Sequence, residues 1–257
     1  MKEERYFYVP RALSGNELPE EEAAHAVRVL RMKEGDEMVL MDGEGAFYQA
    51  AVSTISGKRC FYDITNTMPQ LRPWPWHVHL AIAPTKMMER MEWLAEKATE
   101  VGLDELSFLS CRFSERKVVK VPRIEKIVVA AMKQSRKAWK PALNEMQGFG
   151  SFVESHATGL RFIAHCYEEV PRINLFSILS SPDLEMPEGG NNSGELMVLV
   201  GPEGDFSLDE VRQAVAAGYV SVDLGPSRLR TETAGLAAVM MMQLAMQNRK
   251  DWNKNNG

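Results

Sequence analysis

Cysteine is scarce in this chain of 257 residues, and its three copies stand far apart. Cys60, Cys111 and Cys166 form no CxxC pair and are odd in number, which excludes the disulfide framework of a small secreted protein. We interpret them as reduced thiols. His77 and His79 lie two positions apart on one side of a predicted strand, but no cysteine or carboxylate pattern accompanies them, so no metal site is expected.

Long apolar runs are also absent. The first five residues carry four charges where a signal peptide would begin its apolar stretch, and no later segment replaces it. The longest uncharged apolar stretch, residues 233–248, has 16 residues, whereas a membrane helix needs about 20. The sequence therefore predicts a cytoplasmic protein without a membrane span, and a buried helix at residues 233–248.

The two commonest glycine-rich nucleotide loops are missing too, because the chain contains neither a GxGxxG nor a Walker A sequence. What is present is an ordinary globular composition, with 45% hydrophobic and 25% charged residues. That composition excludes a disordered tail, a collagen-like fibre and a coiled coil. At about 150 residues per domain, the length favours two domains.

Residues 5–66 combine aromatic and β-branched runs with Gly/Asp turns, which is typical of short strands. These strands are predicted at residues 6–9, 37–41, 47–52 and 59–64. Apolar residues at helical spacing predict one helix at residues 19–30. Three prolines within residues 69–76 predict a linker. We therefore expect a small β-barrel-like domain over residues 1–70.

Beyond residue 77 the pattern changes to strands that alternate with longer helices. Strands are predicted at residues 78–83, 162–165, 196–200 and 220–224. Helices are predicted at residues 89–101 and 123–139, and after a capping box at residues 207–210. The second domain, residues 74–250, is therefore expected to be α/β with a mainly parallel sheet. Residues 186–194 are expected to form a surface loop.

Charge is unevenly distributed along the chain. The net charge is −5, yet residues 112–140 carry ten basic residues against Glu115 and Glu125, which makes this segment +8 and the rest −13. The ten are Arg112, Arg116, Lys117, Lys120, Arg123, Lys126, Lys133, Arg136, Lys137 and Lys140. We interpret the segment as a contact surface for a polyanion, with nucleic acid as the first candidate. A solvated helix face is the alternative. Trp139 either stacks on a base or packs against a neighbouring element.

Two glycine-rich loops follow predicted strands. The sequence GPEGDF occupies residues 201–206, and GPSRLRTETA occupies residues 225–234. Ligands of open α/β sheets bind beyond the carboxyl ends of the strands, and glycine lets the backbone approach a ligand closely. Gly-Pro pairs also make ordinary turns, but the two loops together favour a ligand site.

These loops resemble motifs of the ribosomal small subunit RNA methyltransferase E family, which belongs to the SPOUT superfamily. Shorter matching pieces follow one another in the family's order along nearly the whole chain. They are residues 5–7 (RYF), 25–31 (HAVRVLR), 35–36 (GD), 42–45 (DGEG), 97–102 (KATEVG), 114–116 (SER) and 134–135 (QS) followed by Pro141. Each piece is weak, but the ordered set is specific.

The resemblance implies a PUA-like RNA-binding β-barrel domain followed by an α/β methyltransferase domain with a trefoil knot, which forms a homodimer. It also implies that S-adenosyl-L-methionine is used to methylate N3 of one uridine in small-subunit (16S) ribosomal RNA, either as naked RNA or within an assembled subunit. By analogy, the cofactor-binding residues are Gly201, Gly204, Leu224, Gly225, Leu229 and Thr233. Candidates for RNA contact are Arg5, Arg28, Arg31, Arg112, Arg116, Arg136 and Lys137.

The expected reaction assigns roles to two charged residues. Uridine N3 carries a proton and attacks well only as the anion, so the site should stabilise negative charge or remove the proton. Arg230 is the candidate for stabilising the uridine oxygens, and Glu232 is either a base or a residue that orients Arg230. Alternatively, the two form an ion pair that only braces the fold. Arg228 is a candidate for a cofactor, dimer or catalytic contact.

Three positions depart from the family's pattern. Asp205 replaces a second glycine, Lys133 replaces glutamate and Lys137 replaces arginine, which is not a neutral exchange at a bidentate phosphate contact. The dimer is expected to use the helix at residues 233–248, which has more apolar side chains than one sheet face requires. These side chains are Leu236, Val239, Met240, Leu244 and Met246. Two other functions remain open, a non-catalytic RNA-binding protein and an unrelated enzyme whose loops hold a phosphate.

Overall fold

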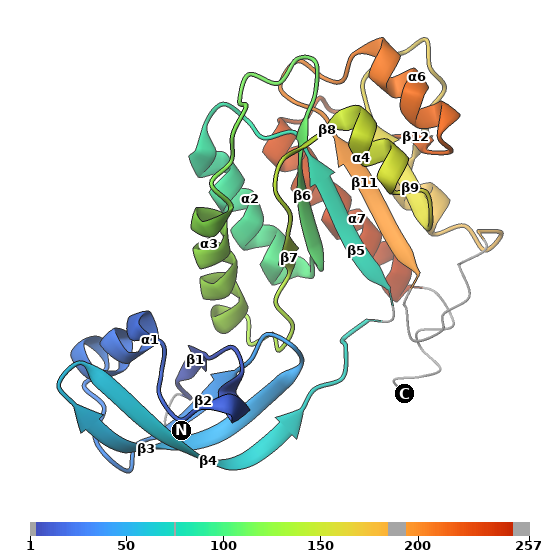
Figure 1. Ribbon diagram of the computed structural model, residues 1–257. Helices are drawn as coiled ribbons and strands as arrows, with labels where there is room; N and C mark the ends of the chain where they lie inside the picture. The colour runs from blue at the N-terminus through green and yellow to red at the C-terminus, as the bar shows by residue number, and fades with distance from the viewer. Residues whose placement is uncertain (1–3, 75, 185–193, 249–257) are drawn as a thin grey trace. The chain divides into compact units, whose positions relative to one another are not determined.

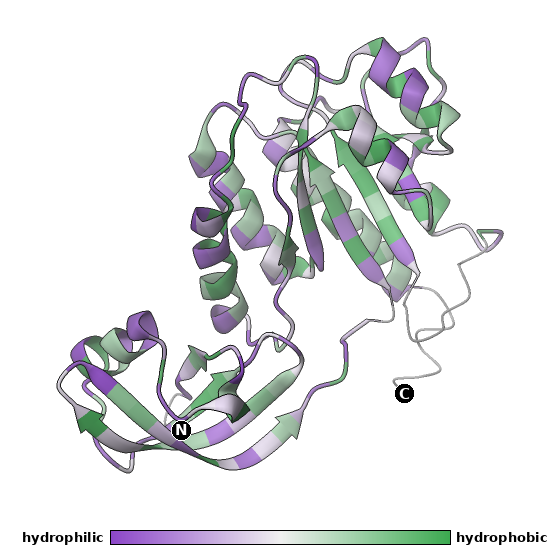
Figure 2. Cartoon of the chain, in the orientation of Figure 1, coloured by the Kyte–Doolittle hydropathy of each residue, from purple (hydrophilic) through white to green (hydrophobic). Residues whose placement is uncertain are grey.

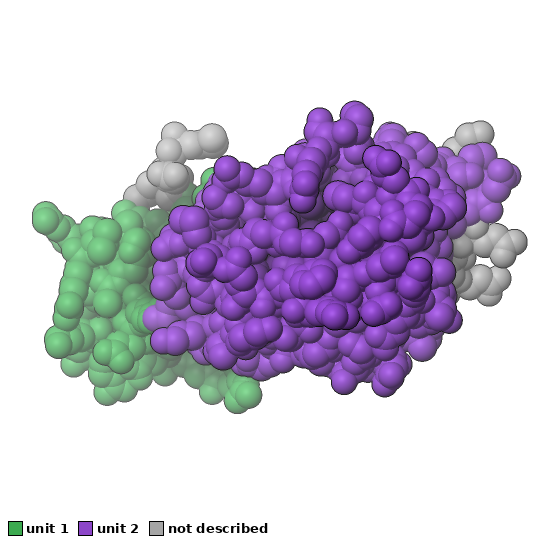
Figure 3. All heavy atoms as spheres, turned by 90° about the horizontal axis from the view of Figure 1, so that it is seen from above, with its two compact units in different colours: residues 1–73, 129–140 green, residues 74–128, 141–257 purple. Residues whose placement is uncertain are grey.

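The computed structural model describes residues 4–74, 76–184 and 194–248, and the chain forms two compact units (Figures 1 and 3). The first unit contains residues 1–73 and 129–140, and the second contains residues 74–128 and 141–257. The predicted loop at residues 186–194 lies almost entirely outside the described residues. Among the residues that are described, no helix has the length and apolarity needed to cross a membrane.

The first unit is built on a four-stranded sheet in the order β1-β2-β3-β4. The strands are β1 (Tyr6–Tyr8), β2 (Glu37–Met41), β3 (Ala46–Ser56) and β4 (Arg59–Pro69). β1 runs parallel to β2, and the other pairs are antiparallel. The short helices are η1 (Ala12–Ser14), α1 (Glu20–Ala24) and η2 (His25–Val29), a π-helical turn that continues α1. The four predicted strands and the predicted helix are therefore confirmed.

Residues 129–140, which are distant in sequence, belong to this first unit. The Lys133 ammonium binds both carboxylate oxygens of Glu22, at 2.7 and 2.8 Å. Trp139 packs on Gly45, where an added Cβ would lie 2.3 Å from the indole ring, so only glycine fits. The Arg72 guanidinium covers the same ring at 4.2 Å. Trp139 is therefore a packing residue, and Lys133 closes an ion pair instead of facing a ligand.

The second unit contains a parallel sheet in the order β10-β12-β9-β11-β5-β6-β7, with β8 beside β6. The strands are β5 (His77–Ile82), β6 (Glu105–Ser110), β7 (Ala142–Leu143), β8 (Gln147–Gly148), β9 (Leu160–Ala164), β10 (Ile173–Asn174), β11 (Glu195–Val200) and β12 (Val220–Asp223). Every neighbouring pair is parallel. The expected parallel α/β domain is confirmed, and the trefoil knot stays a prediction.

Helices cover both faces of this sheet, and Figure 1 shows α4 in front of it and α7 behind. The helices are α2 (Met88–Val101), α3 (Val121–Gln134), α4 (Phe149–Ser155), α5 (Leu175–Leu179), α6 (Leu208–Ala216) and α7 (Thr231–Gln247). Only the part of α3 before residue 129 belongs to this second unit. Leu80 of β5 packs in one core with residues of α2 and α7, whereas its neighbour Ala81 packs in a second core with α4 and α6. Figure 2 shows β5 and β11 mostly in the hydrophobic colour, as expected of strands buried on both faces.

Two helix boundaries test the predictions directly. Ser207 and Glu210 form the predicted capping box at the start of α6. The helix predicted at residues 123–139 ends instead at Gln134, and Arg136 has a φ of 53°. Because a left-handed residue cannot continue a right-handed helix, the chain turns there.

Candidate functional site

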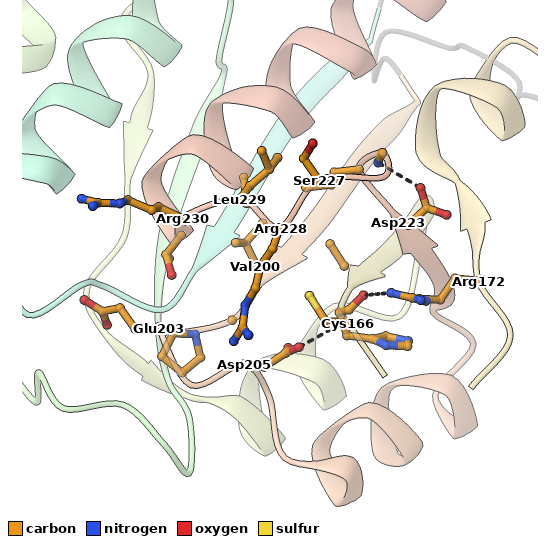
Figure 4. A pocket seen from close by; sticks show the side chains of 18 of the residues that line it. Cys166, Arg172, Val200, Glu203, Asp205, Asp223, Ser227, Arg228, Leu229 and Arg230 are labelled. Atoms are coloured by element: carbon orange, nitrogen blue, oxygen red, sulfur yellow. Dashed lines mark hydrogen bonds between the residues drawn. The ribbon is translucent and has the colours of Figure 1, made fainter. Parts of the chain in front are cut away.

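A pocket of about 440 Å³ opens in the second unit, at the carboxyl ends of β9, β11 and β12 (Figure 4). Its walls come from three loops, at residues 164–166, 200–205 and 223–231, together with Arg90 of α2 and Arg172. This is the edge of a parallel sheet at which ligands bind. Both glycine-rich loops therefore meet at one site.

The first loop needs glycine at its start and accepts aspartate near its end. A Cβ on Gly201 would lie 2.9 Å from the backbone nitrogen of Phe206, a distance that real side chains do not reach. Asp205 has a φ of 67°, a left-handed conformation that aspartate tolerates better than most residues. Glycine, which the family resemblance leads us to expect at position 205, would adopt this backbone without strain.

Asp205 also joins two walls of the pocket. One carboxylate oxygen accepts a hydrogen bond from the backbone N–H of Phe206, at 2.7 Å. The other accepts one from the backbone N–H of Cys166, at 2.8 Å, in the loop that follows β9. The Asp205 side chain thus links the loops after β9 and β11.

The second loop is held by Asp223 at the end of β12. Its Oδ1 accepts hydrogen bonds from the backbone N–H of Gly225, at 2.9 Å, and from the side-chain amide of Asn174, at 3.1 Å. Gly225 has a φ of 112°, which a residue with a side chain rarely adopts. The loop therefore leaves β12 in a fixed turn.

Two arginines that line the pocket have no hydrogen-bonding or ion-pair partner among the described residues. Its three carboxylates all accept hydrogen bonds within the protein, Glu203 from the backbone N–H of Lys86 at 3.0 Å and the other two as described above. Across the described residues, the guanidinium groups of Arg228 and Arg230 have neither a hydrogen bond nor an ion pair. In Figure 4, Arg228 points toward Asp205, and Arg230 extends away from it. These groups are free to bind an anionic or electron-rich ligand.

Glu232 pairs with a residue that the sequence did not indicate. Its side chain is buried, at 7% exposure, and its Oε1 lies 3.5 Å from Nη1 of Arg90. Its Oε2 has no hydrogen-bond partner. Glu232 does not line the pocket, but Arg90 does. The structure therefore connects Glu232 to the site through Arg90, with no ion pair to Arg230.

The predicted cofactor residues separate into two groups. Four of the six line the pocket, namely Gly201, Leu224, Gly225 and Leu229, and Arg230 lines it too. Gly204 and Thr233 are not among the lining residues; Gly204 lies against Phe113 and Thr233 is exposed. Their neighbours Glu203, Thr231 and Ala234 line the pocket instead.

The predicted RNA-contact residues lie in both units. Arg5, Arg28, Arg31, Arg136 and Lys137 belong to the first unit, and Arg112 and Arg116 belong to the second. Arg28, Arg31 and Arg112 are exposed. Arg5 lies 3.5 Å from the Asp36 carboxylate, and Arg136 covers the ring of Tyr6 at 5.5 Å. Arg116 donates hydrogen bonds to the backbone carbonyls of Thr85 and Lys86. The basic segment is therefore not one uniform free surface.

The ionisable groups beside the pocket favour neutral forms. Burial lowers the pKa of His165 below its ordinary value. Burial, together with the Asp205 carboxylate, raises the pKa of the Cys166 thiol. Cys166 is thus protonated near neutral pH and is a poor nucleophile. Within the described part of the chain, no cluster of three or more His, Cys, Asp or Glu side chains is placed to hold a metal ion.

Comparisons with known proteins agree with this architecture. Residues 72–243 match the model of an RNA methyltransferase domain, and residues 18–64 match that of an RNA methyltransferase PUA domain. The chain is 31% identical over 231 residues to ribosomal RNA small subunit methyltransferase E of Mycobacterium bovis, which covers 85% of this chain and 82% of that protein. It is 27% identical over 228 residues to the Bacillus subtilis protein of the same name, and the match covers 85% of this chain and 86% of that protein.

Two solved structures have the same fold over almost their whole length. A probable rRNA methyltransferase from Porphyromonas gingivalis is 38% identical and superposes with a TM-score of 0.84, covering 94% of this chain and 98% of that one. A ribosomal RNA small subunit methyltransferase E from Neisseria gonorrhoeae, solved bound to S-adenosyl methionine, is 25% identical with a TM-score of 0.76, over 94% and 98%. The PUA-like and methyltransferase domains expected from the sequence are confirmed, and the chain belongs to the ribosomal RNA small subunit methyltransferase E family.

Proposed function

We propose that this chain is an S-adenosylmethionine-dependent methyltransferase that acts on N3 of a uridine in small-subunit (16S) ribosomal RNA. The observation that carries the proposal is the pocket itself, where both glycine-rich loops and two arginines without an ion-pair partner meet at the carboxyl ends of parallel strands. Family membership and the cofactor bound to the Neisseria relative support it. We place the reaction in the cytoplasm, where its RNA substrate occurs.

The pocket residues fit a methyl donor of this kind. Gly201 lets the first loop close on itself, because a Cβ there would meet the backbone of Asp205 and Phe206, and Leu224 and Leu229 supply apolar walls. With Gly225 they would hold the cofactor, while Gly204 and Thr233 would support these loops from outside the pocket. S-adenosylmethionine supplies an electrophilic methyl group on a sulfonium ion.

Arg230 is the proposed catalytic residue. Uridine N3 becomes nucleophilic as its proton passes to solvent water, and negative charge then develops on the uracil oxygens. A guanidinium without an internal partner stabilises that charge without first breaking an ion pair. Glu232 is a positioning residue in this proposal, because its ion pair holds Arg90 at the pocket. Proton removal by Glu232 is less compatible with its buried position outside the pocket lining.

We also propose a homodimer formed through the outer face of α7. Met240 and Leu244 are 43% and 50% exposed, and Trp93 is exposed on α2, which packs beside α7. The sequence prediction placed Val239 and Met246 on the same surface, but both are fully buried in the chain's own core. The proposed interface therefore includes fewer residues of α7 than the sequence suggests.

A methyl-transfer assay tests the proposed function. The purified full chain is incubated with S-adenosylmethionine carrying a labelled methyl group and with either naked 16S rRNA or small subunits from a strain that lacks the corresponding enzyme. Labelled N3-methyluridine, mapped by mass spectrometry, is the expected product, and the two substrates show whether assembly is required. RNA binding without transfer would instead support a non-catalytic RNA-binding protein.

A further inference from the structure

A tight turn after β6 presents an aromatic ring to solvent. The backbone N–H of Ser114 donates to the carbonyl of Cys111, at 3.1 Å, and the backbone N–H of Cys111 donates to the Ser114 hydroxyl, at 2.9 Å. Cys111 and Ser114 are buried, whereas Phe113 between them is 47% exposed. Phe113 is therefore exposed by a well-bonded turn and not by a loose segment.

Further contacts fix this turn to the sheet edge. The backbone N–H of Arg112 donates to a carboxylate oxygen of Glu210, at 2.8 Å. The guanidinium of Arg116 is bound by the backbone carbonyls of Thr85 and Lys86, in the loop after β5. Because α6 and the β5 loop both anchor the turn, little further ordering of Phe113 is needed when it binds a ligand.

Phe113 lies beside a loop that lines the pocket. An added Cβ on Gly204 would lie 3.4 Å from the Cβ of Phe113, so the two residues are neighbours in space. The residues on either side of Gly204, which are Glu203 and Asp205, both line the pocket. Phe113 is thus one residue away from the pocket wall, within the same unit.

The charge around the ring favours a nucleobase over an apolar protein surface. The Arg112 guanidinium, which also forms an exposed ion pair with Asp209 at 3.6 Å, lies 5.9 Å from the ring centroid, and Lys117 and Lys120 are exposed on the same loop. Proteins that bind single-stranded nucleic acid combine such cations, which attract the phosphates, with aromatic rings on which bases stack. RNA recognition uses the same stacking on unpaired bases.

We propose that Phe113 is a stacking platform for a base of the RNA that neighbours the methylated uridine. The proposal rests on the proposed function, since it takes the pocket as the place of methyl transfer. Stacking is tolerant of base identity, so Phe113 contributes affinity and positioning, and sequence choice is left to other contacts.

RNA-binding measurements on three variants of the full chain test this platform. Phe113→Ala should weaken binding to 16S rRNA by roughly 5- to 150-fold, the range expected for one stacked base, and Phe113→Trp should restore it. Val118→Ala is the matched control, because Val118 is 68% exposed on the same loop; it should bind as the unaltered protein does. The salt dependence should not change, since no cation is removed.

A fluorescent base gives a readout specific to stacking. With 2-aminopurine beside the mapped methylation site, binding to the unaltered protein should quench the fluorescence, and binding to Phe113→Ala should quench it much less. Unchanged RNA affinity or unchanged quenching in Phe113→Ala overturns the proposal. Loss of S-adenosylmethionine affinity, or dissociation of a dimer in light scattering, also overturns it by giving the ring another role.

The platform and the proposed function fail in different ways. If the protein transfers no methyl group but quenching still depends on Phe113, the proposed reaction is wrong and the platform stands. If methyl transfer is observed and Phe113→Ala changes neither RNA affinity nor quenching, the platform is wrong and the reaction stands.

Discussion

Arg90 and Glu232 form an ion pair across two helices, with Nη1 of Arg90 3.5 Å from Oε1 of Glu232. Arg90 lies in the first turn of α2, and Glu232 lies in the first turn of α7. Only Arg90 reaches the pocket lining. Sequence reasoning assigns Glu232 to catalysis and does not select Arg90. In the structure, Glu232 is connected to the pocket only through Arg90.

This pair distinguishes positioning from base catalysis. If Glu232 positions Arg90, Glu232→Gln should lower turnover moderately, by about tenfold or less, and raising the pH should not restore it. If Glu232 were the base, activity should collapse and higher pH should partly restore it by ionising uridine directly. Single-turnover methylation across pH separates the two roles.

The same pair should show coupling in a double-mutant cycle. Arg90→Ala leaves the buried carboxylate of Glu232 without its partner, which typically costs roughly 1–3 kcal/mol of stability. Combining Arg90→Ala with Glu232→Gln should recover part of that loss, because the neutral amide needs no cation. Urea unfolding of the two single variants and the double variant measures the coupling. Strictly additive effects would show that the ion pair does not stabilise the fold.

Arg230→Ala should slow the chemical step far more than it weakens binding. Loss of one preorganised donor that stabilises developing charge typically lowers turnover by about two to three powers of ten. Arg212→Ala is a control, since Arg212 is exposed on α6 and its charge is only weakly paired with Asp209. If Arg230→Ala instead loses cofactor affinity with the chemical step unchanged, Arg230 is a binding residue.

The two glycines of the first loop should respond differently to alanine. At Gly201 the new Cβ would meet the backbone of Asp205 and Phe206, which cannot move aside like a side chain, so cofactor affinity should fall at least tenfold. At Gly204 the new Cβ would make an ordinary contact with Phe113, and affinity should change little. Titration calorimetry with S-adenosylmethionine measures both, and equal affinities would contradict the assignment of Gly201.

The pocket was predictable where it is local in sequence. Gly201, Leu224, Gly225 and Leu229 lie within two short motifs that follow strands, so a motif and a topological rule were enough to place them together. Arg90 and Arg172 come from other elements and have no distinctive local pattern. Their contribution depends on how α2 and the loop after β9 pack, which sequence periodicity does not specify.

The fold was likewise predictable where the signal is local in sequence, and not where it depends on residues distant in sequence. The capping box of α6 is a local signal and was predicted correctly, but β6 was missed because Glu105 and Ser107 interrupt its apolar pattern. Their partners are distant in sequence, since Glu105 binds His77 and Ser107 binds His79. The assignment of residues 129–140 to the first unit likewise depends on long-range contacts such as Lys133 with Glu22.

Exposed arginines of each unit should contribute separately to RNA affinity. Arg28→Gln in the first unit and Arg112→Gln in the second should each reduce the slope of log affinity against log salt by about 0.7–0.9 if each contacts one phosphate. Lys58→Gln, on the exposed β3–β4 turn, is the control and should leave the slope unchanged. A slope that changes for one arginine only would restrict the RNA contact to that unit.

We expect the free energy of unfolding to depend on pH because of an ion pair at the amino ends of β5 and β6, the end of the sheet opposite the pocket. His77 Nε2 lies 2.7 Å from Glu105 Oε2. This hydrogen bond, with smaller contributions from the charges of Asp104 and Glu195, raises the pKa of His77 above 6.5. Burial by itself raises the pKa of Glu105, but hydrogen bonds from His77 and Asn144 and the charge of His79 more than offset it, and the pKa falls to about 2.

The two pKa shifts affect the stability at opposite ends of the pH range. Because His77 has the higher pKa in the folded state, its stabilising effect is complete below about pH 6.5 and is lost as the pH rises through the folded value. Glu105 has the lower pKa in the folded state, so its effect is present above about pH 4.5 and is lost as the pH falls toward 2. The free energy of unfolding should therefore decline on both sides of a plateau between about pH 4.5 and 6.5.

Variants at His77 and Glu105 separate the decline in stability at high pH from the decline at low pH. His77→Gln should flatten the decline in stability above pH 6.5. Glu105→Gln should remove the declines at both high and low pH, because Glu105 is the group that titrates at low pH and also the partner that raises the pKa of His77. His25→Gln is the matched control, because His25 is exposed and belongs to the first unit. Urea titrations from pH 3 to 9 measure each profile. A His77→Gln protein whose stability still falls by the same amount above pH 6.5 would show that another group causes the decline.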